Sequence, residues 1–288
     1  MTDTAVVEKT LTARPTVEMV AAISSRLNEP DWLRNHRLTA LARFEAAQWP
    51  SDTDEVWRRT PLGTAPLETW RIAETVGKPP ASLASLAGLE RGGLITHVDG
   101  GVVERDIAAA LAARGVLLLP LSDAARDHES LVRPHLNSVA PLDDPTPGNA
   151  RFAALGAALW SQGIFIYVPK DVAVDETLYH LMSKTTVGAG IFGHSLIVAE
   201  PGAMVTVVEA ALSDEPSESS AAPSLALGTV EVVAGDGAQV NLVGLNRWAS
   251  DVHVFNTVRG SLGRGTQVTA GSAVFGGRLH REFSSFDV

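Results

Sequence analysis

The sequence predicts a mainly β protein with a helical or mixed α+β N-terminal half. Near the start of the chain, apolar residues recur at helical spacing over residues 16–27 and 32–48. From Gly163 onward the pattern changes to short β-rich runs separated by glycine-containing turns. A chain of 288 residues is long enough for two domains, or for one domain followed by an elongated repeat.

A stop-and-restart signal, Asn28-Glu-Pro-Asp31, separates the two N-terminal helices. Asp31 is predicted to be the N-cap of the second helix, because a short acidic side chain can accept hydrogen bonds from the first free N–H groups. Residues 94–103 are predicted to form a hairpin around the turn Asp99-Gly100. The elements predicted after this hairpin are a helix at 107–113, a strand at 115–119 and helices at 122–139 and 150–159.

A Gly-small-x-Val motif recurs three times in the second half, at residues 202–205, 237–240 and 265–268. Each copy follows an apolar run and opens an alternating one, and its glycine supplies the backbone freedom that a tight corner needs. This repetition is typical of a β-solenoid, in which each coil buries its face against its neighbours. An antiparallel sandwich with hairpin turns explains the same pattern equally well, so the residues alone leave both architectures open.

Composition excludes several function classes. The net charge of −10 is spread over both halves, so neither half has the basic surface of a nucleic-acid-binding protein. The sequence has no cysteine, so it has no disulfide and no thiolate ligand for zinc or for an iron–sulfur cluster. No apolar run reaches the length of a membrane span, and the N-terminus lacks a secretory signal. We therefore expect a cytoplasmic protein that does not bind membranes.

Three patterns resemble chemical motifs without their required context. Residues 188–193 match Gly-x-Gly-x-x-Gly, but a strand-like run follows where a dinucleotide site needs a helix. Gly193-His194-Ser195 lacks the second glycine of a nucleophile elbow and is interpreted as a turn. The eight histidines show no metal-ligand spacing and are predicted to lie at the surface or in turns. The sequence also has no phosphate-binding loop, so we predict no catalytic residue, no metal site and no bound cofactor.

Several blocks of residues, in a specific order, resemble the SufB/SufD family of iron–sulfur cluster assembly scaffolds. The N-terminal block covers residues 28–41 and continues in Asp54-Glu-Val-Trp-Arg-Arg-Thr60. A second block, Gly163-Ile-Phe-Ile-Tyr-Val-Pro-Lys170, is similar to the family's entry into its β-helix. The remaining similar blocks are residues 194–209, 230–248 and 276–279.

The resemblance implies a right-handed parallel β-helix behind a helical and mixed α+β domain. On this basis the N-terminal domain would cover residues 1–155 and an incomplete β-helix core residues 156–288. It further implies a non-catalytic scaffold subunit of the SUF complex, with a SufB-like subunit and a SufC-like ATPase as partners. The iron–sulfur cluster would then be handled by the full complex and not bound by this chain.

The resemblance also indicates the subunit type. In SufB-type chains the coil that here reads Val208-Glu209-Ala210-Ala211 ends in a cysteine implicated in sulfur transfer. Ala211 cannot form a persulfide, because that chemistry needs a nucleophilic sulfur. A SufD-like chain is therefore favoured. Glu209, Asn246 and Trp248 match family positions and are the candidate site residues.

The sequence stops where family members continue with further coils and a helical segment that docks SufC. We expect the last coil to pair with another chain, including a second copy of this one, or to be poorly ordered. Two alternatives to the scaffold are a β-helix carbohydrate-active enzyme and a purely structural repeat protein. Such an enzyme needs clustered carboxylates, whereas the strand acids Glu200, Glu209 and Glu231 are single and widely spaced.

Overall fold

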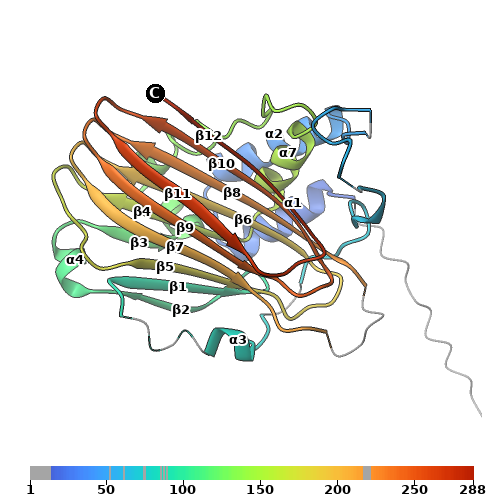
Figure 1. Ribbon diagram of the computed structural model, residues 1–288, viewed down its shortest axis with the longest axis horizontal. Helices are drawn as coiled ribbons and strands as arrows, with labels where there is room; N and C mark the ends of the chain where they lie inside the picture. Colours follow the sequence, from blue (N-terminus) through green and yellow to red (C-terminus); the bar gives the residue numbers. More distant parts are fainter. Residues whose placement is uncertain are drawn as a thin grey trace, which may run out of the picture.

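The structure is a computed structural model that describes residues 14–288 except residues 52, 61, 74, 75, 85, 87, 89 and 217–221. It is mostly β, with two six-stranded sheets and a group of helices packed against one of them (Figure 1). The described helices are α1 (Val17–Arg26), α2 (Asp31–Ala46), the 3-10 turn η1 (Leu62–Thr64), α3 (Ala81–Ala84), α4 (Ala109–Ala113), α5 (Leu121–Asp127), α6 (Glu129–Val132) and α7 (Ala150–Leu159).

The first sheet has the strand order β11-β9-β7-β5-β1-β2, and the second has the order β12-β10-β8-β6-β4-β3. Strands of the first sheet are β1 (Gly93–Val98), β2 (Gly101–Ile107), β5 (Leu178–Ser183), β7 (Met204–Leu212), β9 (Gln239–Arg247) and β11 (Gln267–Val274). Strands of the second sheet are β3 (Leu117–Pro120), β4 (Gln162–Val168), β6 (Gly190–Ala199), β8 (Ser224–Ala234), β10 (Val252–Leu262) and β12 (Leu279–Asp287).

From β4 onward, successive strands alternate between the two sheets, and each pairs in parallel with the strand two positions along the chain. In the described chain only β1 with β2 and β3 with β4 pair antiparallel, at one end of each sheet. The antiparallel sandwich is therefore wrong, because its hairpin turns would reverse every neighbouring strand. The sheets are mixed, largely parallel and not closed on each other at their edges.

The three repeated motifs form the corners between successive strands. Gly202, Gly237 and Gly265 have φ angles of 71°, 70° and 67°. These values lie in the left-handed region that glycine enters at little cost, which explains why the same residue recurs at this place in each repeat. Each glycine precedes a strand of the first sheet by two residues, as the sequence predicted.

The N-terminal helices agree with their predicted ranges, with one correction at a cap. Thr16 caps α1 by accepting a hydrogen bond from the Met19 N–H at 3.3 Å. Asp31 is instead the first residue of α2, whose N-cap is Pro30, and no side-chain hydrogen bond caps that helix among the described residues. Asp31 in the first turn still suits the helix dipole, whose N-terminal end favours a negative charge. The predicted helix at 122–139 is two short helices, α5 and α6.

Two apolar layers form the larger part of the core. One lies between the helices and the second sheet, and the other lies between the two sheets. Helices α1, α2 and α7 contact one another, and α7 contacts β6 and β8. The helix-side layer is rich in aromatic residues, including Trp57, Phe152, Trp160, Phe165 and Phe255. The layer between the sheets is aliphatic and includes Ile95, Ile164, Leu178, Val207 and Val232. Because aromatic side chains bury large areas, the first layer fixes the helices firmly to the sheet.

Strands β1 to β3, which come before residue 155, belong to the same two sheets as the later strands. The boundary between residues 155 and 156 stays a prediction. Within the described part of the chain, no helix is long and apolar enough to span a membrane. Residues 1–13, where a secretory signal would lie, are outside the described residues.

Candidate functional site

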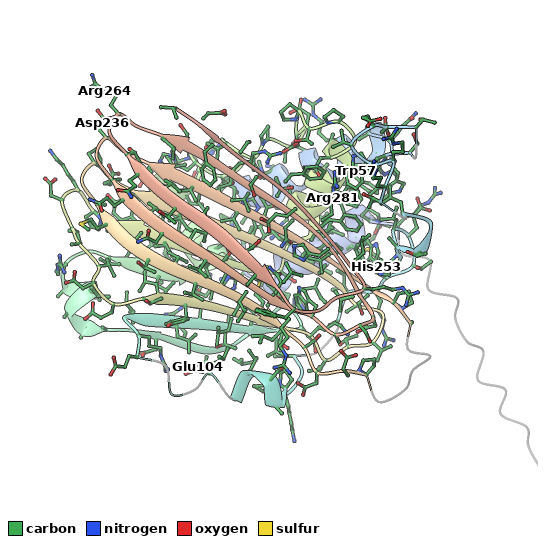
Figure 2. All side chains as sticks on the ribbon, viewed as in Figure 1. Trp57, Glu104, Asp236, His253, Arg264 and Arg281 are labelled. Carbon is green, nitrogen blue, oxygen red and sulfur yellow. The ribbon has the colours of Figure 1, made fainter. Side chains whose placement is uncertain are left out.

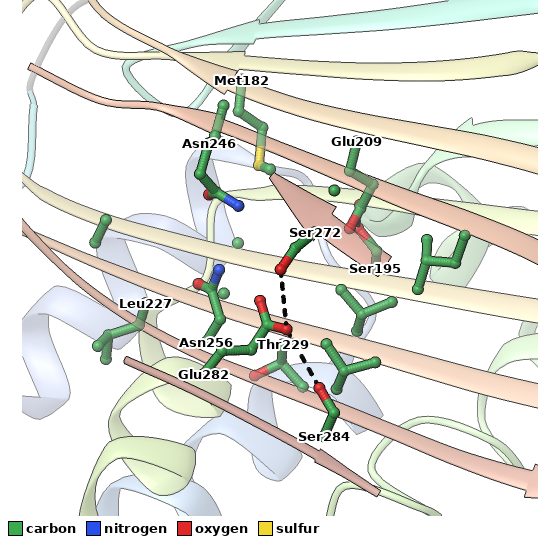
Figure 3. A pocket seen from close by; sticks show the side chains of 18 of the residues that line it. Met182, Ser195, Glu209, Leu227, Thr229, Asn246, Asn256, Ser272, Glu282 and Ser284 are labelled. Atoms are coloured by element: carbon green, nitrogen blue, oxygen red, sulfur yellow. Dashed lines mark hydrogen bonds between the residues drawn. The ribbon is translucent and has the colours of Figure 1, made fainter. Parts of the chain in front are cut away.

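A cavity of about 160 Å³ lies between the two sheets, toward the end formed by β11 and β12 (Figure 3). The first sheet contributes residues from β5, β7, β9 and β11, and the second sheet contributes residues from β6, β8, β10 and β12. Its walls are largely apolar, with a few polar side chains among them. The polar side chains that line the cavity are those of Ser195, Glu209, Thr229, Asn246, Asn256, Ser272, Glu282 and Ser284.

The three candidate site residues all line this cavity. Glu209 lies on β7, Asn246 lies near the end of β9, and Trp248 follows that strand directly. Their functional role stays a prediction, but the structure places them at one location. Ala211, two residues after Glu209 on β7, also lines the cavity.

Strand alternation and register explain why these residues meet. Side chains two apart on a strand share a face, so Glu209 and Ala211 point to the same side of β7. Parallel pairing sets Glu209 opposite Gly244 and Ala211 opposite Asn246. On the facing sheet, Gly228 is paired with Asn256 and leaves room for its side chain, because a Cβ on Gly228 would lie 2.6 Å from Asn256 Oδ1. The cavity therefore depends on small residues at inward-facing positions.

A chain of buried hydrogen bonds leads from β1 to the cavity wall. His97 Nδ1 and His180 Nε2 are hydrogen-bonded at 3.1 Å. His180 Nδ1 donates to Glu209 Oε1 at 3.0 Å, and Ser195 Oγ donates to the same carboxylate oxygen. All four side chains are buried. Glu209 is therefore held in one orientation, and its second oxygen, Oε2, has no hydrogen-bond partner in the described structure.

The prediction that the histidines lie at the surface or in turns is wrong for His97, His180, His194 and His253, which are buried. Burial is the main reason why the pKa of His97 lies well below its ordinary value of 6.5, and the neighbouring His180 lowers it further. Burial also lowers the pKa of His253. No spacing pattern could have revealed the burial of His97, because its strand β1 is buried on both faces and shows no alternation of polar and apolar residues.

We expect stability to fall as the pH decreases below about 6.5, the pKa at which an unfolded histidine takes up a proton. The folded chain keeps His97 neutral to lower pH, so the unfolded state binds more protons in this range. For one such group the loss approaches about 1.4 kcal/mol per pH unit. Urea unfolding at pH 7.5 and pH 5.5 should show a smaller pH effect in His97→Gln than in the wild type. An unchanged pH effect in the variant would contradict this assignment.

Glu282 on β12 lines the outer part of the cavity. Ser272 Oγ and Ser284 Oγ donate to its Oε1, each at 3.3 Å (Figure 3). His280 Nε2 lies 3.7 Å from its other oxygen, Oε2, which is an ion-pair distance. The contact with His280 is the main cause that lowers the pKa of Glu282, and partial burial opposes it. Sequence reasoning missed Glu282. The residue is brought to the cavity by its pairing with Asn256 across β10 and β12, and the sequence alone does not reveal this register.

Another buried carboxylate, that of Glu231 on β8, lies outside the cavity lining and contacts the helical side of the second sheet. It accepts hydrogen bonds from the backbone N–H groups of Asn137, Val139 and Ala140 at 2.7, 3.1 and 3.0 Å. His194 Nε2 donates to it at 2.8 Å. Residues 193–195 lie within strand β6, so the interpretation of these residues as a turn is wrong. Of the strand acids considered from sequence, only Glu209 lines the cavity.

The chemistry of the lining limits what the cavity can bind. It has carboxylates, carboxamides and hydroxyl groups, but no lysine, arginine or histidine. Among the described residues no group of three or more His, Asp and Glu is placed to ligate a metal ion directly. The cavity also contains no thiol, because the sequence has no cysteine. The lining therefore offers hydrogen bonds and negative charge, but no nucleophilic sulfur.

Comparison with known proteins gives consistent matches. Residues 88–179 match the SufBD protein N-terminal region, and residues 180–288 match the SufBD core domain, described as SUF system FeS cluster assembly. An iron-sulfur cluster assembly SufBD family protein from Staphylococcus saprophyticus is 29% identical over 260 residues. A protein of the same name from Staphylococcus epidermidis is 30% identical over 260 residues. Each alignment covers 85% of this chain and 53% of the relative, so the chain spans about half the length of these relatives. The two adjoining matches and the related sequences show that the chain belongs to the SufBD family.

Proposed function

We propose that this protein is a SufD-like, non-catalytic scaffold subunit of an iron–sulfur cluster assembly complex. The observation that carries the proposal is the unbroken match of residues 88–288 to the two SufBD family regions. That range includes every strand that lines the cavity. The two curated relatives from staphylococci carry iron–sulfur cluster assembly in their names.

The scaffold is a right-handed parallel β-helix in this proposal, with the two sheets as its walls. Two features support that architecture. Successive strands alternate between the sheets and pair in parallel with the strand two positions along. The corners contain glycines with positive φ angles at corresponding places. Both features are expected when the chain winds in coils that stack only on their neighbours.

The assignment as SufD-like rests on Ala211. This residue lines the cavity at the position where the family resemblance gives SufB-type chains a cysteine. Without a thiol at this position, the chain has no sulfur to carry a persulfide. The protein would then contribute structure to the complex, and the cluster would be bound elsewhere in it, so the chain itself is no enzyme and holds no cofactor.

The proposed partners are a SufB-like subunit and a SufC-like ATPase in the cytoplasm. The edge strands β11 and β12 are the proposed docking surface, because among the described residues each pairs with another strand on one side only. Phe275, which directly follows β11, is 71% exposed. An exposed aromatic ring beside an unpaired strand edge favours binding of another chain or of a second copy.

Co-expression with a SufB-type chain tests this proposal. The tagged protein should retain the partner through affinity purification. Phe275→Asp should weaken the complex by roughly tenfold or more, because the change places a charge where an apolar contact is buried. Val17→Asp is the matched control, since Val17 is 53% exposed on α1, which is in neither sheet. If the tagged wild type elutes without the SufB-type chain, the proposed function is wrong. If Phe275→Asp and Val17→Asp retain that chain equally well, the strand edge beside Phe275 is not the docking surface.

A further inference from the structure

Asn246 is a buried polar side chain that lacks a partner. Its residue is only 6% exposed, and its carboxamide makes no hydrogen bond within the described structure. Burying an amide without a hydrogen bond is costly, and such groups are rare in folded proteins. Figure 3 shows the Asn246 carboxamide directed into the cavity, with the carboxamide of Asn256 on the facing sheet. An unused donor and acceptor at this place point to a bound ligand.

The charges of the lining indicate the sign of that ligand. Glu209 and Glu282 are both in the lining, and the lining has no positively charged side chain. His180 and His280 contact these carboxylates from outside the lining. An anion placed between two carboxylates would be repelled in a region of low dielectric constant, whereas a cation would be attracted. The lining therefore favours a cation and disfavours sulfide, phosphate and other anions.

Size and donor type narrow the choice further. One water molecule needs about 10–15 Å³ of cavity volume. The cavity has about 160 Å³, so it can hold an ion together with several water molecules. Carboxylate and carboxamide oxygens are suitable ligands for divalent cations that keep part of their water shell. No group of three His, Asp or Glu side chains in the described chain is placed to ligate a metal ion, so water molecules would have to fill the remaining positions around the cation. The cavity thus suits a partly hydrated divalent cation.

We propose that the cavity between the sheets binds one partly hydrated divalent cation through Glu209, Asn246 and Glu282. Resting on the proposed function, we assign ferrous iron as that cation. Cluster assembly needs iron and sulfide, and of these two only iron has the charge that this lining attracts. The ion would be cargo that the scaffold holds before cluster formation. Met182, whose thioether also lines the cavity, adds a soft donor that suits a transition metal better than magnesium.

Manganous ion is the first probe, because Mn²⁺ is stable in air and its free form is measured by electron paramagnetic resonance. The full chain should bind about one Mn²⁺, and Fe²⁺ added without oxygen should displace it, as iron exceeds manganese in the usual affinity order. Asn246→Leu and Glu282→Gln should each weaken binding by roughly tenfold or more. Glu104→Gln is the control for a lost carboxylate, since Glu104 is an exposed residue of β2, outside the cavity lining (Figure 2).

Thermal unfolding of each variant shows whether it keeps the fold. If a folded Asn246→Leu and a folded Glu282→Gln bind Mn²⁺ like the wild type, the cavity is not the site. Absence of saturable binding to the wild type also overturns the inference. If Asn246→Leu fails to fold, Glu282→Gln decides, because its side chain keeps the same shape. The SufB-type co-purification is independent of this result: loss of the complex with intact Mn²⁺ binding refutes the proposed function and leaves the cation site standing.

Discussion

Glu231→Leu is expected to destabilise the protein by about 3–5 kcal/mol, the usual cost of breaking a buried charged network. The Glu231 carboxylate accepts three backbone hydrogen bonds from the segment at residues 137–140 and one from His194. Leucine has a similar size but accepts none of them, so four donors lose their partner at once, and those of Ala140 and His194 are buried. Urea unfolding at pH 7.5 measures the change in the free energy of unfolding.

Two further variants make this measurement specific. Glu231→Gln keeps one acceptor oxygen, so its loss should be smaller than that of Glu231→Leu. Glu129→Ala removes an exposed ion pair with Arg133, which should change stability by less than about 1 kcal/mol. If Glu231→Leu loses no more than Glu129→Ala, the hydrogen bonds at Glu231 do not hold the helical segment to the sheet.

Trp57→Ala is expected to cost about 3–5 kcal/mol, the range for removing a large buried aromatic side chain. Trp57 is fully buried, and its ring centroid lies 5.3 Å from that of Phe152 and 5.4 Å from that of Phe283. Its Nε1 donates to the Pro147 carbonyl at 2.6 Å. Arg281 lies over the same ring, with its guanidinium carbon 5.4 Å from the centroid (Figure 2). The side chain therefore connects the N-terminal region with α7 and with β12.

Limited proteolysis adds a local readout to urea unfolding for this variant. Because Phe283 and Arg281 lie on β12, Trp57→Ala should raise the rate of cleavage within residues 279–287. Trp57→Phe keeps much of the ring contact but loses the hydrogen bond to Pro147, so an intermediate loss is expected. Cleavage of β12 at the wild-type rate in Trp57→Ala would show that the aromatic cluster does not hold this strand.

The parts of the fold that local physics determines were predictable from the sequence. Helix α7 has the predicted range, and the glycines of the three repeats have the positive φ angles that a tight corner demands. Asp99 and Gly100 form the predicted hairpin turn, with φ angles of 49° and 84°. In each case a few neighbouring residues decide the conformation, so a short stretch of sequence carries the information.

The cavity depends on information that no short stretch contains. Strand alternation shows which side chains share a face, but β6 is buried on both faces, so the pattern does not reveal that Ser195 and His194 point to opposite sides. Family resemblance supplied Glu209, Asn246 and Trp248. Glu282 was missed because its place opposite Asn256 follows from the register of β10 and β12, which the sequence alone does not state.

In the proposed role, this chain supports cluster assembly without holding a cluster itself. The most direct measurement is the iron and acid-labile sulfide content after anaerobic reconstitution, for the isolated chain and for its complex with SufB-type and SufC-type partners. The isolated chain should bind iron in its cavity. It should retain no sulfide, because the sequence has no cysteine to ligate a cluster, whereas the complex should acquire both iron and sulfide. Iron and sulfide retained together by the isolated chain, or a complex that acquires neither, would contradict the account.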